Sequence, residues 1–241
     1  MKIALLGYGK MGKVIERIAM ERGHEIVLRK SSGDSFDGLE KADVAIDFSV
    51  PSAAVNNISA SFNANVPVVS GTTGWLEHYD EMIALCNDKK GGFISSSNFS
   101  LGVNIFFGLN EYLAKIMNQF DSYKVSMEEI HHVHKLDAPS GTAMATAQRM
   151  AAASDEWAAD PTKHEVIPGA RGGVGPGGIH VHGVRMVGMT ASQEVILGTA
   201  GQTLVIRHDS NDRVSFMPGV VLACRKVGDL KGLTMGIDSL L

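Results

Sequence analysis

The stretch Lys2-Ile3-Ala4-Leu5-Leu6-Gly7-Tyr8-Gly9-Lys10-Met11-Gly12 decides the fold of this chain of 241 residues. Lys2 to Leu6 is a short apolar run without alternation, which is typical of a parallel strand buried on both faces. From Met11 to Ile18, apolar side chains recur at intervals of three and four, as in an amphipathic helix. A Gly-x-Gly-x-x-Gly pattern between a strand and a helix indicates a loop that holds the pyrophosphate of a dinucleotide. An ordinary tight turn is the alternative interpretation of the three glycines.

Four further apolar runs follow, and helix-length segments separate most of them. They cover Glu25 to Leu28, Asp43 to Phe48, Val66 to Ser70 and Gly92 to Ser95. Strands that alternate with helices predict a parallel sheet, because parallel neighbours need a crossover connection that is usually a helix. The predicted fold class is therefore α/β, with a Rossmann-type doubly wound parallel sheet.

The pattern changes after residue 100. A long helical segment from Leu101 to Phe120 and an alanine-rich helix from Thr142 to Ala153 accompany strands joined by short turns, which predicts an antiparallel or mixed sheet. Val214 to Arg225 has a helical apolar pattern, and we expect it to return to the first domain. The sequence thus predicts a dinucleotide-binding domain of residues 1–100 and 214–241, with an inserted α+β domain of residues 101–213 for substrate binding and oligomerisation. The strand-like segments of the insert are Tyr123 to Ile130, Val181 to Val187, Glu194 to Gly198 and Thr203 to His208, and a glycine-rich loop spans Gly169 to Gly178.

The composition narrows the class of protein. Hydrophobic residues make up 44 % of the chain and charged residues 20 %, as expected for a globular protein with a sizeable core. The formal charge of −4 gives no reason to expect nucleic acid or an anionic membrane as a partner. No apolar segment approaches the roughly 20 residues of a membrane span. The only two cysteines, Cys86 and Cys224, are far apart, so we expect both to be reduced in a cytoplasmic protein.

The residues after the second predicted strand bear on the choice of cofactor. NAD sites usually carry an acid there, which binds the ribose 2′-hydroxyl. This chain has Arg29 and Lys30 instead, and Lys10 lies within the glycine loop. Cations at this position favour a 2′-phosphate, so we predict NADPH as the preferred cofactor, with NADH as the alternative. The other interpretation is that Arg29 and Lys30 are only hydrated charges at a strand end.

Two polar loops follow the fourth and fifth predicted strands. Gly71-Thr72-Thr73-Gly74 comes after the fourth strand, and Ser96-Ser97-Asn98-Phe99-Ser100 comes after the fifth. Ligands of open α/β sheets bind outside the carboxyl ends of the strands. We therefore expect both loops to line the nicotinamide side of the cofactor site.

A second polar cluster runs from Glu129 to Ala143, with the sequence Glu-Ile-His-His-Val-His-Lys-Leu-Asp-Ala-Pro-Ser-Gly-Thr-Ala. Histidine donates protons near neutral pH, lysine supplies a fixed positive charge, and a helix start binds anions through its unpaired N–H groups. The combination predicts a site for a small anionic substrate. Zinc binding is the alternative, but adjacent His131 and His132 would point to opposite faces of a strand, so we expect no metal.

These motifs together resemble the dihydrodipicolinate reductase family, the pyridine-nucleotide-dependent reductases of bacterial lysine and diaminopimelate biosynthesis. The resemblance covers nearly the whole chain in the right order, and Asn211-Asp212-Arg213-Val214-Ser215-Phe216 is similar to the family's return to the cofactor domain. It implies reduction of 4-hydroxy-tetrahydrodipicolinate to tetrahydrodipicolinate with release of water. It also implies a small dicarboxylate substrate, NADPH or NADH as cofactor, and a homotetramer assembled through the second domain.

The resemblance implies roles for individual residues as well. His131 matches the family's general acid, and Lys135 matches its partner in catalysis and substrate binding. His132 matches a ligand of one substrate carboxylate, and the Ser140-Gly141-Thr142 turn matches the receiver of the other. The residues that match the family's cofactor contacts are Gly7, Tyr8, Gly9, Lys10, Met11, Gly12, Gly71, Thr72, Thr73, Ser96, Ser97, Asn98 and Phe99.

The chain departs from the family's pattern at two places. Its glycine loop is one residue shorter than the common Gly-x-Gly-Gly-x-x-Gly form, and Arg29-Lys30 replaces an acid often found after the second strand. The sequence also leaves two other functions open. One is a non-catalytic NADPH-binding sensor, which would need the glycine loop but not the histidine-lysine cluster. The other is a two-domain dehydrogenase of other specificity, which a substrate panel would distinguish from the reductase.

Overall fold

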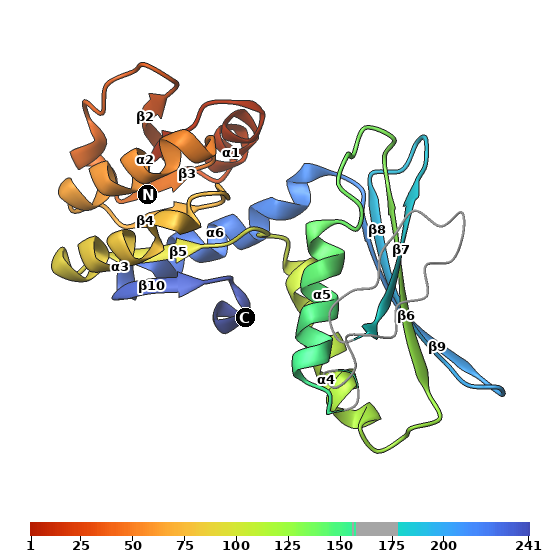
Figure 1. Cartoon of the computed structure of the whole chain (residues 1–241). Coiled ribbons are helices and arrows are strands. Elements are labelled where there is room, and N and C mark those ends of the chain that lie inside the picture. Colours follow the sequence, from red (N-terminus) through yellow and green to blue (C-terminus); the bar gives the residue numbers. More distant parts are fainter. Residues whose placement is uncertain (156, 158–177) are drawn as a thin grey trace. The chain divides into compact units, whose positions relative to one another are not determined.

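The computed structural model describes residues 1–155, 157 and 178–241, and the chain forms two compact units. The first unit comprises Met1–Leu101 and Phe216–Leu241, and the second comprises Gly102–Ser215. Figure 1 shows the chain leaving the first unit after β5 (Gly92–Ser95) and returning to it as α6 (Met217–Lys226). Of the predicted glycine-rich loop, residues 169–177 lie outside the described part of the chain.

A six-stranded parallel sheet in the order β10-β5-β4-β3-β1-β2 forms the centre of the first unit. This confirms the predicted Rossmann-type α/β sheet. Because all strands run in one direction, their carboxyl ends and the loops that follow them share one edge. The strands are β1 (Lys2–Leu6), β2 (Glu25–Lys30), β3 (Val44–Asp47), β4 (Val68–Ser70), β5 and β10 (Gly232–Met235), and the helices are α1 (Lys10–Glu21), α2 (Pro51–Asn63), α3 (Tyr79–Asp88) and α6.

Helices bury both faces of this sheet, which explains why its strands are apolar without alternation. Leu5 and Ile46 pack on one face in a core with side chains of α1 and α6. Val68 and Phe93 pack on the other face with side chains of α2 and α3. All four are at most 2 % exposed, so the central strands have no solvated face.

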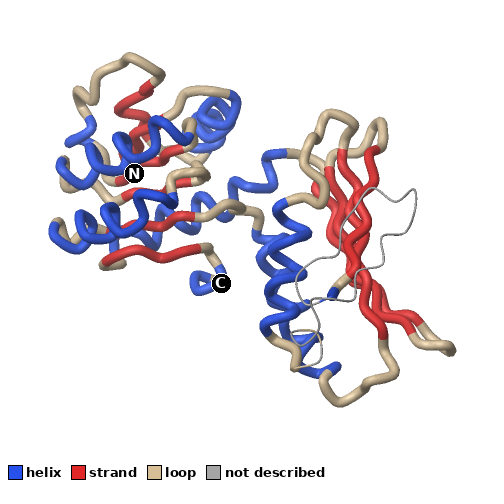
Figure 2. The backbone as a smooth tube through the Cα atoms, in the orientation of Figure 1, coloured by secondary structure: helices blue, strands red, loops and turns tan. Residues whose placement is uncertain are grey.

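A mixed four-stranded sheet in the order β7-β6-β8-β9 forms the second unit. β6 pairs antiparallel with β8, and β8 with β9, whereas β7 runs parallel to β6. Figure 2 shows two helices beside this sheet, and Phe106 and Met150 of these helices share one core with Met127 and Val195 of the strands. The strands are β6 (Lys124–His131), β7 (His180–Arg185), β8 (Ala191–Gly198) and β9 (Thr203–Ser210), and the helices are α4 (Leu101–Met117) and α5 (Gly141–Ala152).

The structure differs from the sequence prediction at several boundaries. The edge strand β10 was not predicted, because its four residues begin at a glycine and carry no periodic pattern. β2 continues beyond Leu28 to include Arg29 and Lys30, whose side chains therefore alternate between the two faces of the strand. None of the helices in the described part of the chain is long and apolar enough to cross a bilayer. Short 3-10 helices cover Leu39–Lys41, Leu76–His78, Arg213–Phe216, Val227–Asp229 and Asp238–Leu240.

The close contact of α6 with the end of the sheet gives a first test of this packing. A Cβ atom added to Gly219 would lie 1.9 Å from the backbone carbonyl oxygen of Phe99, so the helix would have to move. We expect Gly219→Ala to lower the free energy of unfolding by about 1–3 kcal/mol, as overpacking usually does. Chemical denaturation would measure it. The control is Gly228→Ala in the same unit, where the added atom meets nothing described within 4 Å. Equal stability of the two variants would contradict this account of the packing.

Candidate functional site

The glycine loop between β1 and α1 makes a turn that excludes side chains at both of its ends. Gly7 has a φ angle of +106°, and a Cβ atom added there would lie 2.2 Å from the carbonyl oxygen of Phe48. A Cβ atom at Gly12 would lie 2.3 Å from the carbonyl oxygen of Gly7, so this glycine lets α1 pack closely on the loop. Gly9 precedes the first turn of α1, and a Cβ atom there would meet no described atom within 4 Å. The loop therefore leaves room for an anion beside the helix start.

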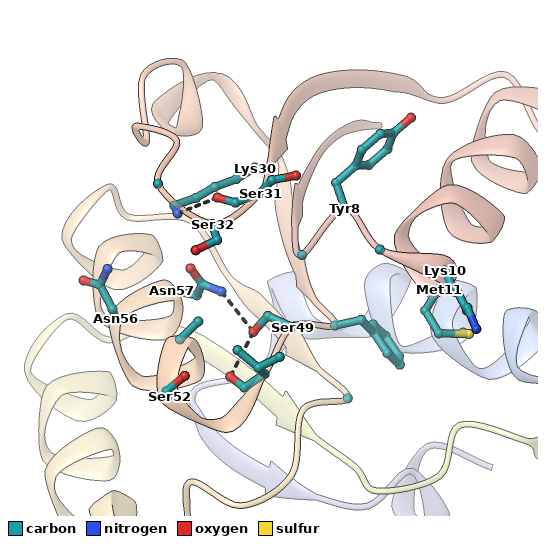
Figure 3. Close-up of a pocket in the computed structure, with 17 residues that line it drawn as sticks. Tyr8, Lys10, Met11, Lys30, Ser31, Ser32, Ser49, Ser52, Asn56 and Asn57 are labelled. Carbon is teal, nitrogen blue, oxygen red and sulfur yellow. Dashed lines mark hydrogen bonds between the residues drawn. The ribbon is translucent and has the colours of Figure 1, made fainter. Parts of the chain in front are cut away.

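A cavity of about 710 Å³ adjoins this loop (Figure 3). Its volume lies within the roughly 300–1,000 Å³ that is typical of ligand and cofactor pockets. The glycine loop, the segment after β2 and the beginning of α2 surround it, as the labelled side chains in Figure 3 show. It is lined by Gly7, Tyr8, Gly9, Lys10, Met11, Lys30, Ser31, Ser32, Gly33, Phe48, Ser49, Val50, Ser52, Ala53, Asn56, Asn57 and Gly71.

A buried carboxylate holds part of the cavity wall in place. Asp47 ends β3 and is fully buried. It accepts hydrogen bonds from Ser49 Oγ (2.6 Å), Asn57 Nδ2 (2.8 Å) and Ser70 Oγ (2.8 Å). The backbone N–H of Ser49 donates to Thr72 Oγ1 at 2.8 Å. These bonds join the loops after β3 and β4 to α2, and they fix two lining residues, Ser49 and Asn57.

The three cations that the sequence placed near the cofactor differ in their surroundings. Lys10 and Lys30 line the cavity, but Arg29 is not among its described lining residues. Arg29 Nε instead donates to Glu16 of α1 at 2.6 Å, and Glu16 also accepts a hydrogen bond from the hydroxyl of Tyr8. The bond from Tyr8, together with that from Arg29, lowers the pKa of Glu16. Glu16 is therefore a carboxylate that engages Arg29 away from the cavity.

The two other predicted cofactor loops follow β4 and β5 and contribute less to the cavity. Gly71 lines it, whereas Thr72 and Phe99 are buried. The ring of Phe99 packs against Phe48, with the ring centroids 5.7 Å apart. These buried side chains shape the loops from within. The remaining predicted residues are Thr73 and Ser97, which are exposed, Asn98, which is half-buried, and Ser96, which is buried.

In the second unit, four polar side chains meet on the face of the sheet that the helices cover. Strand alternation places Glu129 and His131 of β6 on the same face, and both are buried. His131 Nδ1 lies 2.9 Å from Glu129 Oε2. The strand register sets Arg185 of β7 beside His131, and Gln193 of β8 beside Glu129. Three strands thus bring an acid, an imidazole, a guanidinium and an amide together.

Arg185 joins the carboxylate of Glu129 to the loop that follows β6. Its Nη1 and Nη2 atoms both donate to Glu129 Oε1 at 3.2 Å. Its Nε donates to the carbonyl oxygen of Lys135 at 3.2 Å, and Nη2 donates to that of Asp137 at 2.5 Å. One guanidinium therefore fixes a buried strand residue and a loop that carries the predicted lysine.

Glu129 is an ionised carboxylate at neutral pH. Burial raises the pKa of this carboxyl, but hydrogen bonds from His131 and Ser140, the charge of His131 and the hydrogen bond from Arg185 outweigh burial and lower the pKa to about 2. A buried charge persists only where it is paired and hydrogen-bonded, and Glu129 meets both conditions.

The predicted anion-binding turn opens α5. Ser140 is the N-cap residue, and its Oγ accepts from the backbone N–H of Ala143 and from Gln193 Nε2, both at 3.2 Å. Ser140 is therefore buried and committed to the cap. Gly141 is exposed and Thr142 is half-buried in the first turn of the helix.

The other predicted substrate residues lie in the loop between β6 and α5. Lys135 is half-buried, and its Nζ lies 2.8 Å from Asp137 Oδ1. His132 is exposed, with its ring centroid 6.2 Å from that of His134. In the described parts of the chain, the side chains form no group of three or more His, Cys, Asp or Glu that could hold a metal ion.

Sequence reasoning assigned no role to Asp47, Glu129 or Arg185. The pairing of Glu129 with His131 is predictable from the sequence, because a strand places residues two apart on the same face. Asp47 is predictable too, because it ends β3. Ligands of open α/β sheets bind outside the carboxyl ends of the strands, and this applies to β3 as it does to β4 and β5. Arg185 carries no such signal, because its position beside His131 depends on the pairing of strands that lie far apart in the sequence.

The chain matches two family models along almost its entire length. Residues 1–99 match "Dihydrodipicolinate reductase, N-terminus", and residues 102–241 match "Dihydrodipicolinate reductase, C-terminus". The chain is 40 % identical over 238 residues to the 4-hydroxy-tetrahydrodipicolinate reductase of Christiangramia forsetii. This match covers 97 % of this chain and 95 % of that protein. It is 39 % identical over 248 residues to the enzyme of Cutibacterium acnes, with 100 % and 98 % covered.

A solved structure agrees with these relatives. Dipicolinate-bound dihydrodipicolinate reductase from Paenisporosarcina sp. TG-14 is similar to this chain with a TM-score of 0.79 at 32 % identity, covering 100 % of this chain and 99 % of that one. The matches identify a reductase, not a non-catalytic sensor or a dehydrogenase of other specificity. The chain therefore belongs to the dihydrodipicolinate reductase family and catalyses the NAD(P)H-dependent reduction of 4-hydroxy-tetrahydrodipicolinate, a dicarboxylate of lysine and diaminopimelate biosynthesis.

Proposed function

We propose that His131 protonates the substrate during this reduction, while Lys135 and the start of α5 hold its carboxylates. The bound cofactor supplies a hydride from C4 of its nicotinamide ring. Hydride addition to a conjugated imine leaves negative charge on the substrate at nitrogen or carbon, and a positioned acid that quenches it contributes roughly 10²–10⁴-fold. The observation that carries the proposal is the contact of His131 with the buried carboxylate of Glu129.

A dicarboxylate requires two anion-binding groups, and the loop from His132 to Thr142 offers both. Lys135 is a compact cation with three donors, suited to one carboxylate. Lys135 is paired with Asp137, which is exposed. A substrate carboxylate would displace the Asp137 side chain from Lys135, and water would then hydrate the displaced carboxylate. We assign His132 to the same carboxylate as Lys135, and the second carboxylate to the backbone N–H groups of Gly141 and Thr142 at the start of α5. Ser140 contributes by capping the helix.

For the cofactor, we propose NADPH as preferred over NADH, bound along the glycine loop from Gly7 to Gly12. Lys30, supported by Lys10, is the cation we assign to the 2′-phosphate, since both line the cavity. Arg29 is engaged by Glu16 and has a secondary role at most. We assign the nicotinamide to the side of the cavity near Gly71 and the loop of Ser96 to Phe99.

The two units divide this work in our proposal. Residues 1–100 and 214–241 bind the dinucleotide, and residues 101–213 bind the substrate and assemble a cytoplasmic homotetramer. The apolar side chains of Leu204 and Val205 on the edge strand β9 are 42 % and 48 % exposed, which favours contact with another chain. The cytoplasm suits the free thiols of the buried Cys86 and Cys224, which stay reduced there.

The role of His131 is tested by His131→Gln. We expect turnover to fall by roughly 10²–10⁴-fold, because glutamine cannot deliver the proton, while the affinity for NADPH is unchanged. The assay follows oxidation of NADPH with substrate formed in situ from pyruvate and aspartate semialdehyde. His78→Gln, an exposed histidine of the first unit, is the control. Turnover that survives His131→Gln would show that another group is the acid.

The cofactor preference is tested by comparing Lys30→Ala with Arg29→Ala. Loss of a charged hydrogen bond to the 2′-phosphate should lower kcat/KM for NADPH by roughly 10-fold in Lys30→Ala. The value for NADH should change little, because NADH lacks that phosphate. Arg29→Ala should have a smaller effect, since Glu16 binds its guanidinium. If Lys30→Ala affected both cofactors equally, Lys30 would have no part in discrimination.

The tetramer is tested by measuring the native mass with light scattering. We expect four times the 25.7 kDa of the chain, and Val205→Glu should reduce this mass, because a buried unpaired charge at an interface is costly. Met20→Glu, at an exposed apolar residue of α1, is the control and should leave the mass unchanged. A monomeric wild-type protein would refute the assembly.

A further inference from the structure

We propose that Glu129 and Arg185 are positioning residues of this reaction: Glu129 orients the ring of His131, and Arg185 fixes both that carboxylate and the loop that carries Lys135. The proposal rests on the assignment of His131 as the acid. Neither residue is assigned to substrate or cofactor. Glu129 acts through His131, and Arg185 acts through Glu129 and through the loop that carries Lys135.

The contact of Glu129 with His131 determines which ring nitrogen faces outward. Nδ1 lies 2.9 Å from Glu129 Oε2, and the carboxylate has no proton of its own to donate, so this ion pair favours the tautomer with a hydrogen on Nδ1. Nε2 is then the atom that holds the transferable proton. When Nε2 delivers that proton to the substrate, His131 becomes neutral with Nδ1–H still facing Glu129, which remains ionised. One proton moves, and the pair is ready to accept the next from water.

Arg185 keeps the carboxylate in this position from the other side. Its two Nη atoms bind Glu129 Oε1, which leaves Oε2 for His131. The side chains of Glu129 and Arg185 are only 0 % and 9 % exposed, so water does not compete for these bonds. The carboxylate therefore meets Arg185 at one oxygen and His131 at the other, and its plane cannot rotate without breaking a buried pair.

The same guanidinium sets the backbone of the substrate loop. Its bonds to the carbonyl oxygens of Lys135 and Asp137 determine where the loop runs after β6. Lysine at this position would keep the charge but could not span carboxylate and carbonyls at once, because its donors share a single nitrogen. Arg185 thus couples the position of the acid to that of the cation that we assign to a substrate carboxylate.

The central experiment compares Glu129→Gln with Glu128→Gln. Glutamine retains the size of Glu129 but presents either an oxygen or an NH₂ group to Nδ1, so the ring loses its fixed tautomer. We expect kcat to fall by at least ~100-fold, as when the acid that orients a catalytic histidine is neutralised. The solvent isotope effect on kcat should rise, because proton transfer becomes slower than hydride transfer. The dissociation constants of NADPH and dipicolinate should stay within ~3-fold, a variation too small to reflect a lost charged bond.

Glu128 is the matched control because it is the neighbouring residue of β6 and alternates to the other face. Glu128 is half-buried, and Glu128→Gln keeps the size of its side chain, so turnover should stay within ~2-fold. A merely structural ion pair at Glu129 would instead lower the unfolding midpoint and leave kcat and the solvent isotope effect of the folded protein unchanged. That result would overturn the proposal.

Arg185→Lys tests the second half of the proposal. We expect kcat/KM for the substrate to fall by roughly 10-fold, corresponding to the loss of charged hydrogen bonds to the loop, with KM for NADPH unchanged. An unaltered kcat/KM would show that the loop needs no such anchor.

Two measurements keep the proposal testable if Glu129→Gln does not fold. In wild-type protein, proton NMR should show a downfield Nδ1–H resonance that disappears in His131→Gln, and its absence would overturn the proposal. Glu129→Asp, which withdraws the carboxylate by one methylene, should also lose turnover. The results separate the two hypotheses. If His131→Gln is active, the assigned acid is wrong. If it is inactive while folded Glu129→Gln turns over normally, only the positioning role is wrong.

Discussion

A carboxylate buried within a sheet must find hydrogen-bond partners, and this requirement organises both units of the structure. Asp47 and Glu129 are each fully buried on a strand. An unpaired charge there would destabilise the fold by several kcal/mol, so each acid fixes the side chains that surround it. In the first unit these partners are Ser49, Asn57 of α2 and Ser70 of β4, and the first two line the cavity. In the second they include the acid that we assign to the reaction.

The two carboxylates differ in the kind of partner. This difference distinguishes a carboxylate that only supports the structure from one that can assist a proton transfer. Asp47 accepts from the neutral donors Ser49, Asn57 and Ser70, which hold no transferable charge. Glu129 forms ion pairs with His131 and Arg185. A histidine beside a carboxylate can gain and lose a proton without moving, because the carboxylate compensates the imidazolium and a permanent cation compensates the carboxylate. The apolar core around them limits competition from water.

The sequence predicted what is encoded locally. The glycine loop, five strands of the parallel sheet and the cap at Ser140 each depend on neighbouring residues, whose pattern is visible in the chain. β10 was missed because an edge strand of four residues needs no periodicity to pair with β5. The pair formed by Glu129 and Arg185 was missed for a different reason. Its members are separated by 56 residues between Glu129 and Arg185, and only the parallel register of β6 and β7 brings them together.

At the end of β2, the contact of Arg29 with Glu16 changes the role that the Arg29-Lys30 motif predicts. Arg29-Lys30 predicts two cations for a cofactor phosphate, but successive residues of a strand point to opposite faces. Lys30 lines the cavity, and Arg29 turns to Glu16 on α1, where Tyr8 of the glycine loop donates to the same carboxylate. The neighbouring helix thus supplies an acid at the end of this strand, and that acid pairs with Arg29 and Tyr8. Glu16 ties the glycine loop to β2 and leaves Lys30 as the residue of the pair that we assign to the cofactor.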